Sequence, residues 1–143
     1  MIIHTASEGI TLAKKLENDS ARFYEDMATK FTKNAETLQS FARENKKNIA
    51  QIERAYYGVI TDAIEGGYAF NLDTDKYTLK TEIPAGAGYT DALKQALEVE
   101  NIISAFYTEA AKQSGGLMAD VPRNFLLVAK KRAARIEKLK QLA

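Results

Sequence analysis

Six polar side chains fall on the otherwise apolar faces of the predicted helices, where a folded chain normally places its core. They come from four separate segments and are Glu17, Asn45, Asn48, Glu100, Arg132 and Arg135. Carboxylates can bind metal ions, whereas an arginine stays protonated and only donates hydrogen bonds. Because an isolated buried polar group is costly, we expect the six to meet in one layer and pair with one another. The alternative is that some of them lie at the edge of an apolar stripe and reach solvent.

The first half of the chain is predicted to form two helices. Residues 5–31 carry apolar side chains at intervals of three and four, which is the pattern of a buried helix face. Thr5 and Glu8 have the spacing of a capping box at its start. A second stripe begins near residue 34 and ends near Gly66-Gly67, a typical C-cap signal.

The second half is predicted to form two more helices. Thr90 is the expected N-cap of the third helix, which ends at Ser114. Asp120 and Pro122 open the fourth helix, because proline is tolerated in the first helical turn. Chain length, helix count and apolar stripes together predict an all-α protein, with residues 1–143 forming a single four-helix-bundle domain.

Residues 68–89 separate the two halves and are predicted to form one long crossover connection between the second and third helices. The alternation over 77–83 favours a short extended piece within it. Tyr68, Phe70 and Tyr77 are three aromatic residues in this connection. We expect them either to cap the bundle or to form a contact between two copies of the chain.

The two halves share a spacing. Glu17 precedes Tyr24 by seven residues, and Glu100 precedes Tyr107 by the same number; each tyrosine follows a phenylalanine. Any two amphipathic helices look somewhat alike, but this spacing occurs twice on the predicted apolar stripe. The pattern therefore indicates an internal repeat.

On these residues the chain resembles the ferritin-like superfamily, and within it the rubrerythrin-like di-iron carboxylate proteins. Members take a glutamate from each of two helices and a Glu-x-x-His pair from each of the other two. The resemblance implies a ferritin-like bundle, with Glu17 and Glu100 at retained metal-ligand positions. The positions of the Glu-x-x-His pairs hold other residue types and are Asn45, Asn48, Arg132 and Arg135. The cysteine-rich tail of true rubrerythrins has no counterpart in this sequence.

These replacements predict a metal-free, non-catalytic protein. Two carboxylates are too few for a two-metal centre, and two arginines neutralise two glutamates without any ion. We therefore expect no cofactor, and glutamate–arginine pairs in place of the metal. The alternative is a di-iron oxidoreductase or peroxidase with non-standard ligands from Glu44, Asp19 or Glu98, although we expect those three to be solvated surface charges. Because family members often self-associate, the resemblance also predicts a homodimer.

Composition excludes several other sites. The chain has 143 residues, no cysteine, one histidine and a net charge of +1. It therefore has no disulfide, thiolate metal site or cysteine nucleophile, and we expect His4 to be a solvated terminal residue. No stretch has the length and apolarity of a membrane span, and the first residues do not form a signal peptide, so we expect a cytoplasmic protein that makes no membrane contact.

A third possibility is a binding module built on the last helix. Its basic residues are Arg123, Lys130, Lys131, Arg132, Arg135, Lys138 and Lys140. A basic helix can contact phosphate backbones, but this one has no interleaved aromatic residues. We expect a solvated basic face and no nucleic-acid partner.

Overall fold

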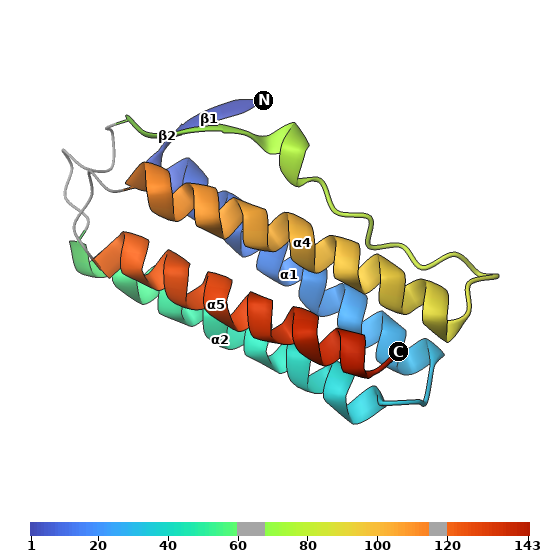
Figure 1. Cartoon of the computed structure of the whole chain (residues 1–143). Helices are drawn as coiled ribbons and strands as arrows, with labels where there is room; N and C mark the ends of the chain where they lie inside the picture. Colours follow the sequence, from blue (N-terminus) through green and yellow to red (C-terminus); the bar gives the residue numbers. More distant parts are fainter. Residues whose placement is uncertain (60–67, 115–119) are drawn as a thin grey trace.

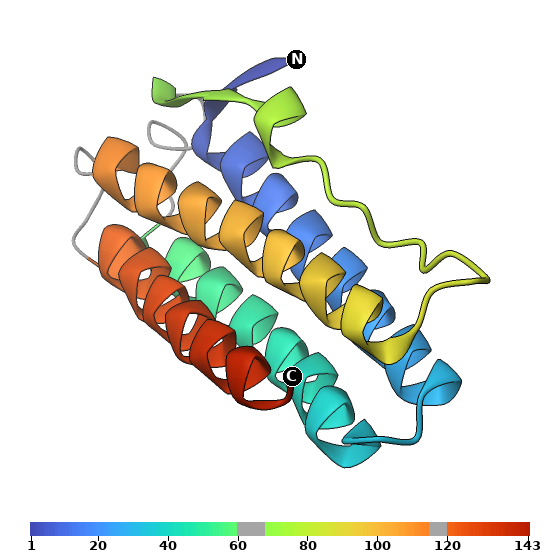
Figure 2. The same ribbon diagram turned by 45° about the vertical axis from the view of Figure 1, so that its right-hand side comes forward.

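Four long α helices account for most of the described chain. The computed structural model describes residues 1–59, 68–114 and 120–143. The helices are α1 (Ala6–Lys30), α2 (Ala35–Val59), α4 (Tyr89–Gln113) and α5 (Asp120–Gln141). They lie side by side, with α1 and α5 running one way and α2 and α4 the other (Figures 1 and 2). None of the described helices is long and apolar enough to cross a membrane.

The helix ends follow local chemistry. At α1, the Thr5 side chain accepts from the Glu8 backbone N–H at 3.1 Å, and the Glu8 carboxylate accepts from the Thr5 N–H at 3.1 Å, so the predicted capping box is present. At α4 the predicted N-cap Thr90 is wrong. The cap is Gly88, whose N–H donates to the Asp91 carboxylate at 3.2 Å, and the helix therefore starts earlier. The C-cap predicted near residues 66 and 67 lies outside the described residues.

A small antiparallel ribbon replaces the extended piece predicted at 77–83. Strand β1 (Ile2–Thr5) pairs with β2 (Tyr68–Asp73), and Ile3 lies opposite Leu72. A 3-10 turn, η1 (Thr74–Tyr77), follows, and residues 78–84 have no strand partner in the described chain. Residues 78–84 form no paired strand because pairing depends on a partner, which β1 provides only to residues 68–73.

The ribbon also corrects the expectation for His4. Its side chain is half-buried, and its Nδ1 lies 3.3 Å from the Phe70 carbonyl oxygen. The ribbon packs closely on α1, where a Cβ at Gly9 would overlap the Phe70 ring. A glycine is therefore needed at this point for β2 to approach the helix.

Residues 78–88 run along the outside of α1 and α4 towards the start of α4 (Figure 2). Side chains of both helices hold the backbone of this segment. The Lys30 ammonium donates to the carbonyls of Pro84 and Ala85 at 2.9 and 3.0 Å. The Gln95 amide donates to the carbonyls of Lys80 and Glu82 at 2.8 and 2.9 Å.

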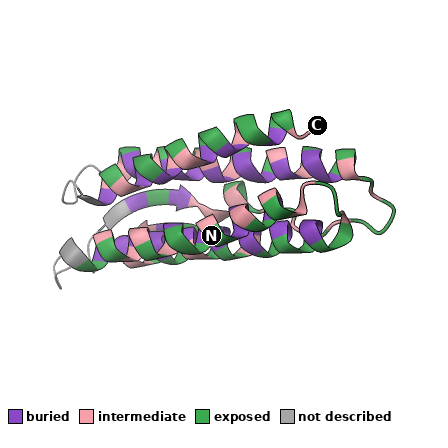
Figure 3. Ribbon diagram, turned by 90° about the horizontal axis from the view of Figure 1, so that it is seen from below, coloured by how far each residue is buried: buried purple, intermediate pink, exposed green. Residues whose placement is uncertain are grey.

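The buried faces of the helices meet in the interior (Figure 3). They form two apolar clusters rather than one continuous core. The first includes Leu16, Ile52 and Val128, near the ribbon, and the second includes Phe41 and Leu139, towards the other end. Along α2 and α5, the polar residues of the predicted layer occupy the positions between the two clusters.

Candidate functional site

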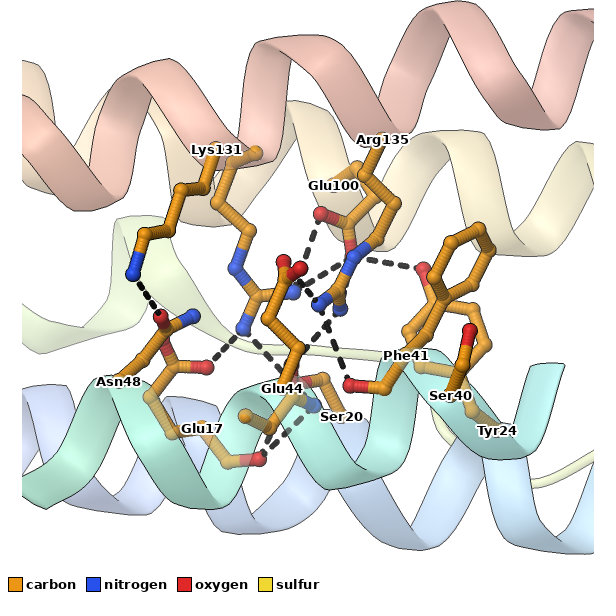
Figure 4. A network of polar contacts seen from close by, with 12 residues as sticks. Glu17, Ser20, Tyr24, Ser40, Phe41, Glu44, Asn48, Glu100, Lys131 and Arg135 are labelled. Atoms are coloured by element: carbon orange, nitrogen blue, oxygen red, sulfur yellow. Dashed lines mark hydrogen bonds and ion pairs between the residues drawn. The ribbon is translucent and has the colours of Figure 1, made fainter. Parts of the chain in front are cut away.

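All six predicted polar residues are buried at the middle of the helices. Glu17, Asn45, Asn48, Glu100 and Arg132 have no exposed surface, and Arg135 is 2% exposed. Figure 4 shows the network of polar contacts between the helices, in which Glu17, Glu100 and Arg135 take part. The tertiary structure therefore creates a charged layer that divides the apolar core.

Arg132 of α5 is the centre of this layer. Its Nη1 donates to both carboxylate oxygens of Glu100, at 3.0 and 2.7 Å. Its Nη2 donates to the carboxylate of Glu17 and, at 3.0 Å, to the hydroxyl of Ser20. One guanidinium thus bridges glutamates of α1 and α4, the two residues that the family resemblance assigns as metal ligands.

The two tyrosines of the repeat bind these glutamates crosswise. The Tyr24 hydroxyl of α1 donates to Glu100 of α4 at 2.6 Å, and the Tyr107 hydroxyl of α4 donates to Glu17 of α1 at 2.9 Å. Both tyrosines are fully buried, each in a different apolar cluster. Each ring therefore lies in apolar surroundings while its hydroxyl reaches the charged layer.

Ser20 links the layer to α2 and was not among the six predicted residues. Its hydroxyl donates to the Glu17 carbonyl at 3.1 Å and accepts from the Asn45 side-chain amide at 2.8 Å as well as from Arg132. One donor and two acceptor positions are thereby used, which is the full capacity of a hydroxyl. Its place on the same stripe as Glu17, three residues later, was the signal in the sequence.

Arg135 lies beside Arg132 but contacts mainly α2. Its Nη1 donates to the Asn45 side-chain oxygen at 2.7 Å, and its Nη2 donates to the Phe41 carbonyl at 3.2 Å and to the Glu44 carboxylate at 2.8 Å. The closest Glu100 oxygen is 3.7 Å away. The guanidinium also lies 4.8 Å from the centre of the Phe41 ring and 5.3 Å from that of Tyr24, which is cation–π geometry.

Asn48 differs from the other five predicted residues. Its side-chain oxygen accepts from the Lys131 ammonium at 3.4 Å, and Lys131 also donates to Gln51 at 2.9 Å. Its amide nitrogen has no hydrogen-bond partner among the described residues. The prediction of one connected network therefore applies to five residues, with Asn48 at its margin.

The charges of the layer shift the pKa values of its members. Burial alone would lower the pKa of Arg132, but the attraction of Glu100 and Glu17 outweighs burial and raises it, so the guanidinium stays charged. Burial raises the pKa of Tyr24 well above its ordinary value, and the negative charge of Glu100 raises it further. Burial and Glu17 have the same effect on Tyr107. Both phenols therefore stay protonated and keep donating to the carboxylates.

The alternative ligands do not join the two glutamates. Asp19 binds Lys15 at 2.6 Å and Arg22 at 3.2 Å, and Glu98 is exposed. Glu44 is partly exposed and is paired with Arg135. Within residues 1–59, 68–114 and 120–143, no group of three or more histidine, cysteine, aspartate or glutamate side chains is arranged to hold a metal ion.

The predicted basic face of the last helix is smaller than the sequence suggested. Arg132 and Arg135 point into the core rather than to solvent, and Lys131 is half-buried. The remaining lysines of this helix are exposed.

Searches of protein-family models, of curated proteins and of solved structures each found no match to this chain.

Proposed function

We propose that this chain is a non-catalytic, metal-free protein of ferritin-like architecture, most similar to the rubrerythrin-like branch. In this proposal a buried ion-pair layer takes the place of the di-iron centre, and residues 68–89 belong to the long crossover connection between the second and third helices. Its role is structural: it presents a rigid four-helix surface to partners. The observation that carries the proposal is the position of the Arg132 guanidinium between Glu17 and Glu100.

The chemistry of the layer does not fit an iron centre. Iron requires carboxylate lone pairs that point at the ion, yet the carboxylate oxygens of Glu17 and Glu100 accept from Arg132, Tyr24 and Tyr107. A cation at the same place would also be repelled by two guanidinium groups. The two arginines already balance the two glutamates, so an added ion would leave buried charge without compensation.

A register role follows from how the contacts connect the helices. Arg132 joins α5 to α1 and α4, Arg135 joins α5 to α2, and Asn45 joins α2 to α1 through Ser20. Sliding any helix by one turn, about 5.4 Å, would break several charge-assisted hydrogen bonds at once. The layer is therefore suited to selecting one alignment of otherwise similar apolar faces.

Metal content tests the proposal directly. Purified protein is offered ferrous iron without oxygen, freed of unbound metal and submitted to elemental analysis. We expect no stoichiometric iron. A positive control places the family's ligand types at the four replaced positions, through Asn45→Glu, Asn48→His, Arg132→Glu and Arg135→His, and should bind iron if it folds.

The opposite result has a clear meaning. About two irons per wild-type chain would overturn the proposal and favour a di-iron oxidoreductase with ligands that the structure does not bring together. Iron-dependent turnover of peroxide by the wild-type protein would lead to the same conclusion.

A further inference from the structure

The outer surface of α5 exposes two neighbouring leucines among basic residues. Leu126 is 56% exposed and Leu127 is 42% exposed. The exposed lysines and arginines of α2 and α5 are Arg43, Lys46, Lys47, Arg54, Arg123, Lys130, Lys138 and Lys140. We call Leu126, Leu127, Lys130 and Lys138 the α5 ridge.

Among the described side chains of α2 and α5, fewer acidic than basic residues are exposed. The exposed acids among the described side chains of α2 and α5 are Glu36 and Glu137. Glu36 is paired with Arg43 at 2.9 Å and Glu137 with Lys140 at 3.4 Å. The α5 ridge is thus apolar at Leu126 and Leu127 and positively charged further along the helix, at Lys130 and Lys138.

The opposite side of the molecule has a groove between α1 and residues 74–82. Two adjoining hollows of about 570 and 420 Å³ share Lys15 and Leu79 in their walls. The larger hollow has apolar walls that include Ile3, Leu12 and Tyr77. A groove of this kind is a typical seat for apolar side chains from one face of a helix.

The charge of the groove is opposite to that of the ridge. Its acidic lining residues are Glu8, Asp19, Asp26, Asp75 and Glu82, and its cations are Lys15, Arg22 and the N-terminal ammonium of Met1. Lys15 and Arg22 are both paired with Asp19, and the Met1 ammonium lies 3.7 Å from Asp73 and 3.8 Å from Asp75. The groove lining therefore carries more acidic than basic groups beside the apolar walls of the larger hollow, and this complements the α5 ridge.

We propose that the α5 ridge of one copy of this chain docks into the α1 groove of a second copy, forming a head-to-tail assembly. Helix α5 and the segment 74–82 lie on different sides of the bundle, separated by α4 and α1 (Figures 1 and 2), so the ridge of one chain does not reach its own groove. Leu126 and Leu127 enter the larger hollow, while Lys130 and Lys138 face the acidic rim. Because the two contact surfaces differ, each added copy leaves a ridge and a groove free for the next.

A second copy of the chain explains both surfaces better than an anionic membrane does. A basic ridge with exposed leucines would also suit an anionic membrane surface, but that partner would leave the acidic groove without a role. The chain's net charge is only +1, so its charge is separated between two faces rather than in excess. Complementary opposite faces on a nearly neutral chain favour self-association that salt weakens.

The experiment is sedimentation velocity over a range of protein concentrations at low and high ionic strength. The ridge variant is Leu126→Gln/Leu127→Gln. The groove variant is Thr11→Arg/Asp75→Lys, and both of its residues are exposed and line the larger hollow. We expect wild type to associate reversibly at low salt and to dissociate at high salt, and each variant alone to be monomeric. An equimolar mixture of the two variants should form dimers and nothing larger, since it contains one intact ridge and one intact groove.

Tyr57→Gln is the matched control, because Tyr57 is an exposed apolar residue of α2 that lies outside the ridge. The Tyr57→Gln variant should associate as wild type does. Wild type that is monomeric throughout, a ridge variant that still associates, or a mixture that stays monomeric would each overturn the proposal. Leucine-dependent binding of monomeric wild type to vesicles rich in anionic lipid would assign the ridge to a membrane instead. Circular dichroism of each variant confirms folding, and none of these outcomes depends on metal content.

Discussion

Removing the Arg132 guanidinium tests the charged layer most directly. Arg132→Met keeps most of the side-chain bulk but leaves Glu17 and Glu100 buried without the cation that now lies within 2.7 Å of Glu100. At an effective dielectric constant of about 20, two unit charges 4 Å apart attract by about 4 kcal/mol. Desolvation offsets part of that attraction. Breaking a buried pair by removing one partner nevertheless costs about 3–5 kcal/mol, since the remaining charge is uncompensated.

The assay is urea unfolding followed by circular dichroism, which yields the free energy of unfolding. We expect Arg132→Met to lose about 3–5 kcal/mol and Arg132→Ala to lose more, because alanine adds a cavity. The triple variant Glu17→Gln/Glu100→Gln/Arg132→Met removes all three charges and should recover most of the loss. Lys130→Met, one exposed neighbour of Arg132 on α5, should leave stability unchanged. A cost below about 1 kcal/mol for Arg132→Met would refute the reasoning, because a buried double ion pair cannot be lost so cheaply.

Three further predictions concern the donors around the glutamates. Tyr24→Phe should lower the free energy of unfolding by about 1–3 kcal/mol, measured by urea titration, because Glu100 loses a buried donor; no change would mean that the hydroxyl contributes nothing. In alkaline titration followed by tyrosinate absorbance, Tyr24 and Tyr107 should stay protonated after the other phenols ionise. Their raised pKa values favour the folded state below pH about 10, and that contribution to stability is lost as pH rises further. Ionisation of all tyrosines near pH about 10 with the fold intact would contradict the prediction. Ser20→Ala should cost about 1–2 kcal/mol in the same urea assay, because Arg132 and its neighbours lose an acceptor, whereas a neutral effect would show that Ser20 is dispensable.

Much of the helical framework could be predicted from the sequence because it depends on local chemistry. The capping box of Thr5 and Glu8 and the stripes of apolar residues involve positions three or four residues apart, so they can be recognised before the fold is known. The same stripes identified the six polar residues that the structure buries. At the start of α4 the residue type of Thr90 suggested an N-cap, but the cap is Gly88, whose N–H donates to Asp91, so the prediction misplaced the cap.

Only the tertiary structure decided which of these residues meet. Tyr24 is two helical turns, about 10 Å, from Glu17 on the same helix, so its hydroxyl finds a partner on α4 instead. The pairing of β1 with β2 and the partner of His4 likewise depend on segments more than sixty residues apart, which no local pattern encodes. The sequence thus identified the six buried polar side chains, whereas the placement of α5 decided that Arg132 alone bridges both glutamates, because a guanidinium bonds only what its helix brings within reach.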